Sequence, residues 1–344
     1  MEKRNEILFL TEIRAFACIA IVFLHTFYAS IAFSPSFTER TIAITVRNLM
    51  MWAVPCFVMV TGTLLLDKMR GVTYKKLFTK YIPRIALALI IFAVIFELLD
   101  TIAAGDAIGI GTFFTGIKNA VLGKSWSHMW YLYMVIGLYL LLPFYRKIAA
   151  SLGKKDASYL IWIYIVFLSL LPMLETITTV KPAFYICVYT VYPLYLFLGY
   201  VIHQNLLSVP RWVWTLLAVL GTIAMGVLTV ISEKTNSETL SKLLTNYAFP
   251  IIVLQSAGVY GMFSQKKAAF PKWLEFVLCQ IDKCSFGIYL IHMIFLKVIM
   301  VYFKWDPFTH GGIFMVLLIT LAVAIVSFVC VFLLKKIPGV KKLL

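Results

Sequence analysis

Long apolar runs, separated by short and mostly basic segments, restrict this chain to very few folds. A helix needs about 20 consecutive apolar residues to cross a bilayer, and ten runs come close to this length. Of the 344 residues 62% are hydrophobic and 13% are charged, and a soluble domain of this size cannot bury so much apolar surface. We therefore predict an all-α, polytopic integral membrane protein with a single domain, residues 1–344. The predicted spans are 8–30, 42–66, 82–104, 128–145, 157–174, 183–202, 211–231, 243–263, 284–303 and 312–334.

The distribution of positive charge predicts how these spans are oriented. Most of the 31 lysine and arginine residues fall near the chain ends and in every second connecting segment. Loops that stay in the cytoplasm carry an excess of these residues, so both termini are expected there. The net charge of +16 belongs to these loops, and it indicates the lipid bilayer rather than a nucleic acid as a partner. The expected location is the plasma membrane, crossed several times.

The longest predicted external segment, residues 105–127, allows two structures. It is rich in glycine and partly apolar. A short re-entrant or interfacial helix fits this composition as well as a plain loop does, and both remain open.

No metal site is expected from the cysteines and histidines. No two possible ligands have the spacing that a metal site requires. Cys279 and Cys284, the closest pair of cysteines, match neither a zinc ribbon nor a redox motif. We interpret all six cysteines as small core residues: Cys18, Cys56, Cys187, Cys279, Cys284 and Cys330.

Two ionisable residues share one face of the first span. Arg14 and His25 are eleven residues apart, which turns a helix to within about 20° of the same direction and separates them by about 16 Å along its axis. Arg14 alone could extend toward the inner headgroups, and His25 alone could bond a neighbouring helix. Charge in a bilayer is costly and usually functional, so the pair predicts a polar path along this face.

The second cytoplasmic segment predicts a site for anions. It carries six basic residues within DKMRGVTYKKLFTKYIPR. Such a run is also typical of a loop beside anionic lipid, and that interpretation stays open. The six are Lys68, Arg70, Lys75, Lys76, Lys80 and Arg84.

A carboxylate in the third span is a candidate partner for His25. Glu97 is expected at a similar depth to His25 when both are counted from the inner ends of their helices, and Asp100 and His128 lie at the outer ends of neighbouring spans. A carboxylate that holds an imidazole in one tautomer and raises its basicity would make His25 a general base. In the ninth span, His292 and Lys297 should point about 140° apart.

Four short motifs follow one another in the spans. The first span reads LTEIRAFACIAIVFLHTF, with Arg14 and His25, and the second reads VPCFVMVTGTLLL. The fourth reads SHMWYLYMVIGLYLLLPF and the ninth FGIYLIH. In their order and spacing these motifs resemble membrane acyltransferase family 3, the ten-span O-acyltransferases of bacterial surface glycans. The other matching residues are Pro55, Thr61, Gly62, His128, Trp130, Tyr131, Gly137, Tyr139, Pro143 and His292.

The resemblance implies transfer of an acyl group, expected to be acetyl, across a bacterial cytoplasmic membrane. Acetyl-CoA would be the donor, with its phosphates against Arg14, Lys76, Lys80 and Arg84. A hydroxyl of a cell-surface or lipid-linked glycan would be the acceptor, and His25 would be the general base, paired with Glu97. The expected substrate-binding residues are His128, Trp130, Tyr131 and His292.

One departure from the family pattern concerns the donor end. Many members carry Arg-x-x-Arg where the second cytoplasmic segment enters the third span, but this chain reads KYIPR. Tyr81 stands at the first arginine position and Arg84 at the second. Lys80 can replace the charge, but lysine cannot offer phosphate the bidentate fork of a guanidinium.

Several alternatives remain open at this level. A transporter or flippase for a lipid-linked glycan would use the same intramembrane charges as a path, and a structural partner in polymer export would need none of them. Succinyl-CoA as donor would require a further cation near His25, for which Lys297 is the internal candidate. Direct transfer and an acyl-His25 intermediate are not separated, and the acceptor sugar and the oligomeric state are undetermined.

Overall fold

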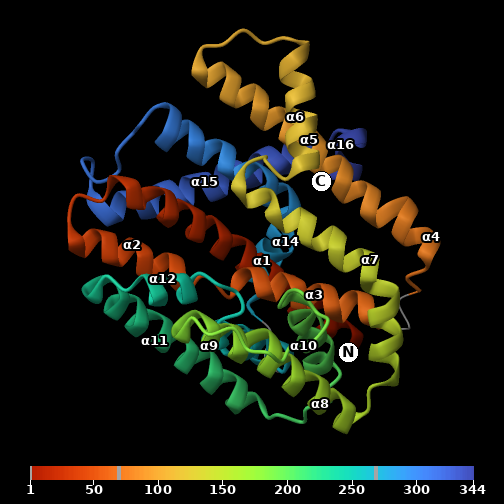
Figure 1. Cartoon of the computed structure of the whole chain (residues 1–344). Coiled ribbons are helices and arrows are strands. Elements are labelled where there is room, and N and C mark those ends of the chain that lie inside the picture. Colours follow the sequence, from red (N-terminus) through yellow and green to blue (C-terminus); the bar gives the residue numbers. More distant parts are fainter. Residues whose placement is uncertain (1, 68–70, 267–269) are drawn as a thin grey trace.

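The computed structural model describes residues 2–67, 71–266 and 270–344, and within these ranges every regular element is a helix, with no strand (Figure 1). The predicted all-α membrane fold is therefore confirmed. The α-helices are α1 (Glu2–Ser30), α2 (Phe37–Leu49), α3 (Ala53–Leu66), α4 (Tyr74–Lys76), α5 (Ile82–Ala104), α6 (Ile110–Leu122), α7 (Trp130–Ser151), α8 (Lys154–Ile165), α9 (Leu171–Thr178), α10 (Tyr192–His203), α11 (Arg211–Thr235), α12 (Glu238–Leu244), α13 (Pro250–Ser264), α14 (Lys272–Leu296), α15 (Gly312–Leu334) and α16 (Pro338–Leu343).

Eight helical stretches in the described ranges are long and apolar enough to cross a membrane. They correspond to eight of the ten predicted spans, and π-helical segments join α4 to α5, join α8 to α9 and extend α14. The stretches are Leu8–Phe33, Phe37–Leu66, Tyr74–Ala104, Ser127–Ser151, Lys154–Thr178, Arg211–Thr235, Lys272–Tyr302 and Gly312–Leu334.

The other two predicted spans, 183–202 and 243–263, contain shorter helices. Helix α10 begins only at Tyr192, and α13 is separated from α12 by residues 245–249. Each of these helices has a proline in its first turn, Pro193 and Pro250. Proline is tolerated there because its missing N–H has no intrahelical partner anyway, but in a helix interior it removes a hydrogen bond. The predicted spans were therefore wrong in running through these prolines as unbroken helices.

Segment 105–127, for which a helix and a loop were both open, contains the helix α6. Helix α6 forms a hairpin with α5 at the edge of the bundle (Figure 1). Gly116 permits the close packing, because a Cβ there would lie 2.7 Å from the Cα of Val94. On its other side α6 exposes large apolar side chains, among them Ile110, Phe114 and Val121. In a membrane protein such a face is suited to lipid.

The cysteines are only partly the core residues that we predicted. All six are free; Cys18, Cys56 and Cys284 are buried, whereas Cys187 is exposed in the segment between α9 and α10. That segment lies within a predicted span but is not helical, so the core assignment of Cys187 was wrong.

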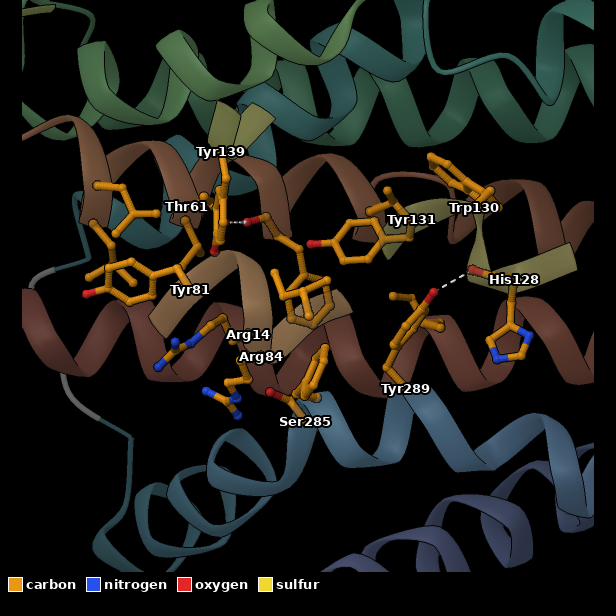
Figure 2. Close-up of a pocket in the computed structure, with 18 of the residues that line it drawn as sticks. Arg14, Thr61, Tyr81, Arg84, His128, Trp130, Tyr131, Tyr139, Ser285 and Tyr289 are labelled. Atoms are coloured by element: carbon orange, nitrogen blue, oxygen red, sulfur yellow. Dashed lines mark hydrogen bonds between the residues drawn. The ribbon is translucent and has the colours of Figure 1, made fainter. Parts of the chain in front are cut away.

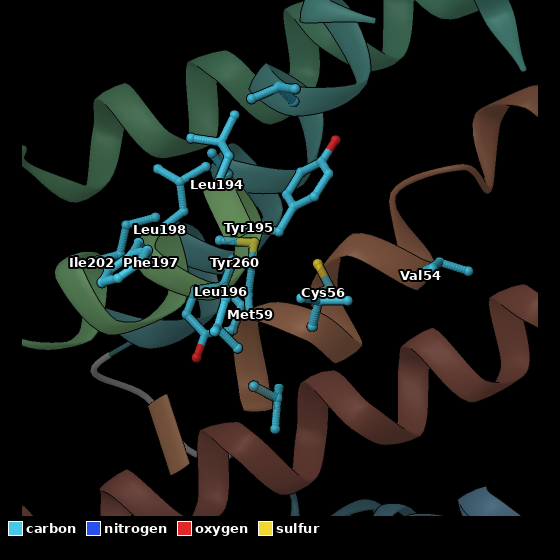
Figure 3. Close-up of a cluster of buried hydrophobic side chains, with 14 of the residues drawn as sticks. Val54, Cys56, Met59, Leu194, Tyr195, Leu196, Phe197, Leu198, Ile202 and Tyr260 are labelled. Atoms are coloured by element: carbon cyan, nitrogen blue, oxygen red, sulfur yellow. The ribbon is translucent and has the colours of Figure 1, made fainter. Parts of the chain in front are cut away.

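Helices α3 and α10 touch almost backbone to backbone at the centre of the largest apolar cluster (Figure 3). A Cβ on Gly62 of α3 would lie 1.9 Å from the carbonyl oxygen of Leu196, and one on Gly199 of α10 would lie 2.0 Å from that of Met59. Small residues allow membrane helices to approach in this way, and the gain comes from close van der Waals packing. The hydroxyl of Thr63 also donates to the Gly199 carbonyl at 2.9 Å.

Gly199→Ala is therefore expected to destabilise the protein by about 1–3 kcal/mol, the usual cost of overpacking, because either α3 or α10 must move. The measurement is the thermal unfolding midpoint of the purified protein in detergent. The matched control is Gly137→Ala in α7, where an added Cβ meets nothing within 4 Å. Equal midpoints for the two variants would contradict the argument.

Helix α1 runs through the middle of the bundle beside α14, and the two helices are parallel (Figure 1). Arg14 pairs with Asp282 near one end of this helix pair, and His25 pairs with His292 about eleven residues further on. The two helices are therefore joined by two polar contacts about 16 Å apart along the axis of α1.

Candidate active site

The central contact of the site joins His25 and His292. Nδ1 of His25 lies 2.8 Å from Nε2 of His292, and the rings are stacked with centroids 5.0 Å apart. His292 is fully buried, and its Nδ1 lies 2.9 Å from the carbonyl oxygen of Ile288, one turn earlier in α14.

These distances determine the tautomers of a neutral pair. The Ile288 carbonyl can only accept, so Nδ1 of His292 carries a proton and donates it there. Nε2 of His292 is then an acceptor, because a neutral imidazole has one N–H and one lone pair. His25 must donate from Nδ1, which leaves the lone pair on its own Nε2. This Nε2 makes no hydrogen bond to the described part of the chain, and His25 lines a cavity.

His128 is the third imidazole of the site. Its ring centroid lies 6.3 Å from that of His25 and 5.7 Å from that of His292. The side chain is 3% exposed, and neither ring nitrogen has a hydrogen-bond partner among the described residues. The hydroxyl of Tyr289 donates to the backbone carbonyl of His128. The ring packs against those of Phe96, Trp126 and Tyr289. It is thus held in place with its polar atoms unused, and it lines the same cavity as His25.

The cavity connects the two ends of the polar path that the sequence predicts. Its volume is about 290 Å³, and its lining includes Arg14, Arg84 and Tyr81 at one end and His25, His128 and Trp130 at the other. Figure 2 shows the arginines beside Ser285 and Tyr81, and His128 and Trp130 at the far end. The prediction that Arg14 and His25 share one face is therefore confirmed. A narrow, flexible chain could follow this path.

Arg14 has a carboxylate partner that we did not predict. Nη2 of Arg14 donates to Oδ2 of Asp282 at 2.8 Å, and Nε lies 2.7 Å from Oδ1. The Arg14 side chain is 32% exposed and lines the cavity, so it can still contact a ligand there. Asp282 was not predicted because it lies two residues before the predicted ninth span, whereas α14 begins at Lys272. An acidic residue at the edge of an apolar run was the available signal.

The other predicted donor residues differ in position. Arg84 lines the cavity, and its guanidinium donates to the carbonyl oxygens of Leu343 and Leu344 at 3.0 and 2.9 Å. Lys76 and Lys80 are exposed and do not line it, and Lys76 donates instead to the Gly71 carbonyl. Both lysines precede α5, and their predicted contact with the donor's phosphates stays a prediction. Lys68 and Arg70 lie outside the described residues.

The predicted pairing of Glu97 with His25 was also wrong. Oε2 of Glu97 accepts a hydrogen bond of 2.8 Å from the side-chain amide of Asn119 in α6. Similar depth in the membrane was a poor guide, because Glu97 is on the face of α5 that packs against α6. The partner of His25 comes from α14, and it is an imidazole instead of a carboxylate.

Asp100 and Lys297 belong to a separate cluster next to the site. Oδ1 of Asp100 accepts from Nζ of Lys297 at 3.0 Å and from the hydroxyl of Tyr302 at 2.5 Å, and Oδ2 accepts from the indole N–H of Trp126 at 2.7 Å. As predicted, His292 and Lys297 point to different partners. The cluster fixes Trp126 two residues before His128, so it supports the turn that carries this histidine.

Of the remaining predicted substrate-binding residues, Trp130 and Tyr131 line the cavity, but His292 does not, because it lies behind His25. Tyr289, which the sequence analysis missed, lines it too. In the described ranges no group of three or more histidine, cysteine or carboxylate side chains is arranged to hold a metal ion.

A helical membrane bundle with a cavity that leads from arginines to an imidazole with a free lone pair has the features of an integral membrane enzyme. A family model for the acyltransferase domain, acyltransferase family 3, matches residues 7–336, nearly the whole chain. The protein belongs to this family and is a membrane acyltransferase. No curated protein and no solved structure matches it.

Proposed function

We propose that the protein transfers an acetyl group from acetyl-CoA in the cytoplasm to a hydroxyl of a cell-surface or lipid-linked glycan of a bacterium, with His25 as general base. The observation that supports this most is the free Nε2 of His25 inside the cavity, held in its tautomer by His292.

The reaction requires one proton transfer and one exchange of bonds. The acceptor hydroxyl gives its proton to Nε2 of His25 while its oxygen attacks the thioester carbonyl. The new C–O bond forms, the C–S bond breaks, and the proton passes from His25 to the leaving CoA thiolate. During attack the His25 ring becomes positively charged, and the lone pair on Nε2 of His292 stabilises it through the Nδ1–H hydrogen bond. Positioned general bases contribute about 10²–10⁴-fold to rate.

His128 is suited to stabilise the oxyanion of this reaction. A neutral imidazole always carries one N–H, and neither nitrogen of His128 is used within the described structure. A donor already held in place beside the cavity stabilises developing negative charge without reorganisation. In this proposal the thioester oxygen points toward His128, and the acyl carbon lies between His25 and His128.

The arginine end of the cavity is suited to the donor's phosphates. Arg14 and Arg84 supply guanidinium groups, which bind phosphate with bidentate geometry. The nucleotide would stay at this mouth, and the pantetheine arm would extend about 16 Å along α1 toward His25. Arg84 would exchange the carbonyl oxygens of α16 for phosphate oxygens.

Acetyl is preferred over succinyl because the described residues that line the cavity around His25 include no cation for a second carboxylate. Lys297, the residue that succinyl-CoA would require, is paired with Asp100 and covers the ring of Trp126 at 3.9 Å. It does not line the cavity.

Purified protein in lipid nanodiscs tests the proposal against the transporter alternative. With acetyl-CoA and a glycan acceptor, an acyltransferase releases free CoA thiol, measured with a thiol reagent, and the acceptor gains an acetyl group, measured by mass spectrometry. A transporter or flippase would move the glycan and leave the thioester intact.

Arg14→Ala is expected to raise the KM for acetyl-CoA about ten- to a hundredfold, because a charge-assisted hydrogen bond to phosphate contributes about 1.5–3 kcal/mol. The KM of Arg14→Lys should lie between those of the wild type and Arg14→Ala. Lysine keeps the ion pair with Asp282 but lacks the bidentate geometry of a guanidinium. The control is Arg40→Ala, whose side chain pairs with Glu233 on the exposed surface. An unchanged KM in Arg14→Ala would reject its role at the donor.

A further inference from the structure

A second hollow adjoins the His25 end of the cavity. It has a volume of about 590 Å³ and lies between the segment that leads into α10 and the segment between α12 and α13. We call it the Tyr192 groove, and its lining includes Tyr189, Thr190, Tyr192, Lys242, Asn246 and Tyr247.

Aromatic rings lie where the Tyr192 groove meets the cavity. Trp130, which lines the cavity, has its ring centroid 5.7 Å from that of Tyr192 and 5.6 Å from that of Tyr247, and the two tyrosine rings are 6.3 Å apart. Tyr247 lines both spaces. A ligand seated in the groove therefore lies directly beside the end of the cavity where His25 is found.

The floor of the groove is held by hydrogen bonds to its backbone. The Tyr195 hydroxyl donates to the carbonyl of Tyr247 at 2.7 Å, and the Ser169 hydroxyl donates to that of Ala248 at 2.6 Å. Oδ1 of Asn246 accepts from the N–H of Ala248 at 2.9 Å. These three contacts tie the segment to α10, to the π-helical turn between α8 and α9 and to itself, so the aromatic lining is preformed.

The polar groups of the groove are available to a ligand. The hydroxyls of Tyr189, Tyr192 and Tyr247 and the amide N–H₂ of Asn246 make no hydrogen bond within the described part of the chain. The one cation, Lys242, is exposed and lies 3.4 Å from Glu238, so the groove does not provide the buried positive charge that a phosphate or carboxylate would favour. Its chemistry suits an uncharged ligand with an apolar face and several hydroxyls.

We propose that the Tyr192 groove binds a pyranose ring of the acceptor. The C–H face of such a ring packs on aromatic side chains, while its ring hydroxyls need donors and acceptors at the edge, and the groove supplies both. One hydroxyl of the bound sugar would pass Trp130 and Tyr247 to reach Nε2 of His25. This assignment rests on the proposed acyl transfer and specifies which part of the molecule selects the acceptor.

The test uses the full-length protein in nanodiscs with acetyl-CoA and a panel of methyl glycosides, with cyclohexylmethanol and glycerol as non-sugar alcohols. We expect saturable acetylation of at least one glycoside and none of cyclohexylmethanol, which has the ring and a hydroxyl but lacks the ring hydroxyls. Tyr192→Leu and Tyr247→Leu should raise the KM for that glycoside about five- to tenfold, as expected from lost aromatic contacts. The KM for acetyl-CoA should stay unchanged in Tyr192→Leu, because Tyr192 does not line the cavity.

Tyr189→Ser is a groove variant that should fold normally, because this side chain is fully exposed and its loss cannot disturb the core. It should also raise the glycoside KM, though less. The matched control is Tyr159→Leu, an exposed tyrosine of α8 that lies outside the groove and should leave both KM values unchanged.

Two arms distinguish the source of the sugar. A water-soluble methyl glycoside represents a free polymer end, and a long-chain alkyl glycoside in the nanodisc bilayer represents a lipid-linked sugar; the lower KM identifies the source.

In intact cells, a membrane-impermeant maleimide should label Cys187, two residues from Tyr189, and should not label Cys187→Ser. Failure to label Cys187 would contradict an outward-facing groove.

The outcomes separate this assignment from the proposed function. Unchanged glycoside KM in all three groove variants, or acetylation of glycerol or cyclohexylmethanol but of no glycoside, would overturn the groove and leave acyl transfer standing. Absence of thioester consumption by the wild type under all conditions would overturn the proposed function itself.

Discussion

His25→Ala is expected to lower the rate of acetyl transfer by about 10²–10⁴-fold, the usual contribution of a positioned general base, with the protein still inserted at normal levels. Of the four ring nitrogens of His25 and His292, Nε2 of His25 is the one whose lone pair is not used in a hydrogen bond. It belongs to the ring that lines the cavity. Alanine removes this proton acceptor. Nε2 of His292 lies behind the missing ring, and the ring centroid of His128 is 6.3 Å from that of His25, so neither takes its position.

The measurement is release of CoA thiol by the purified variant at saturating acetyl-CoA and acceptor. Because the loss is in proton transfer, kcat should fall while the KM for acetyl-CoA stays close to that of the wild type. The control is His310→Ala, an exposed histidine two residues before α15 that stacks on Trp305. Near-normal kcat in His25→Ala would remove His25 from the mechanism.

His292→Leu is expected to have the second largest effect, a loss of about 10²-fold in kcat, at the lower end of the range for general bases. Leucine cannot accept the Nδ1 proton of His25. The His25 ring is then free to take the other tautomer, with its proton on Nε2, which cannot act as a base. It also loses the lone pair that stabilises the positive charge formed during attack.

His292→Gln separates positioning from packing. The glutamine side-chain oxygen can occupy roughly the place of Nε2 and accept the Nδ1–H of His25, so this variant should recover much of the activity that leucine loses. Both variants fill the buried site and should have similar thermal stability, and neither should change the KM for acetyl-CoA, because His292 does not line the cavity. Equal activity of the two variants would show that His292 acts through packing alone.

Local sequence was sufficient for the parts of the site that lie on one helix. The eleven-residue spacing of Arg14 and His25 placed them on one face of α1, because the rotation per residue of a helix is constant. The same arithmetic separated His292 from Lys297. The apolar runs located eight spans, and they were misjudged at Pro193 and Pro250, where the backbone hydrogen bonds of a helix start anew.

Contacts between helices were not predictable in the same way. Equal depth suggested Glu97 as the partner of His25, yet depth does not specify which face of a helix meets which neighbour. Gly116 brings α6 against α5, and Asn119 then takes the Glu97 carboxylate. The pairing of Arg14 with Asp282 and of His25 with His292 follows from α14 lying parallel to α1, so that a step of eleven residues along α1 matches a step of ten along α14.

By itself the sequence determined the membrane as solvent, the all-helical fold and the polar face of α1, because apolar length and helical periodicity are properties of continuous segments. The order and spacing of four motifs indicated the family. The tertiary structure decided that an imidazole and not a carboxylate orients His25, that Arg14 is shared with Asp282, and that an aromatic groove adjoins the cavity. Each of these depends on side chains that are far apart in the chain and meet only because close packing allows a single arrangement of the helices.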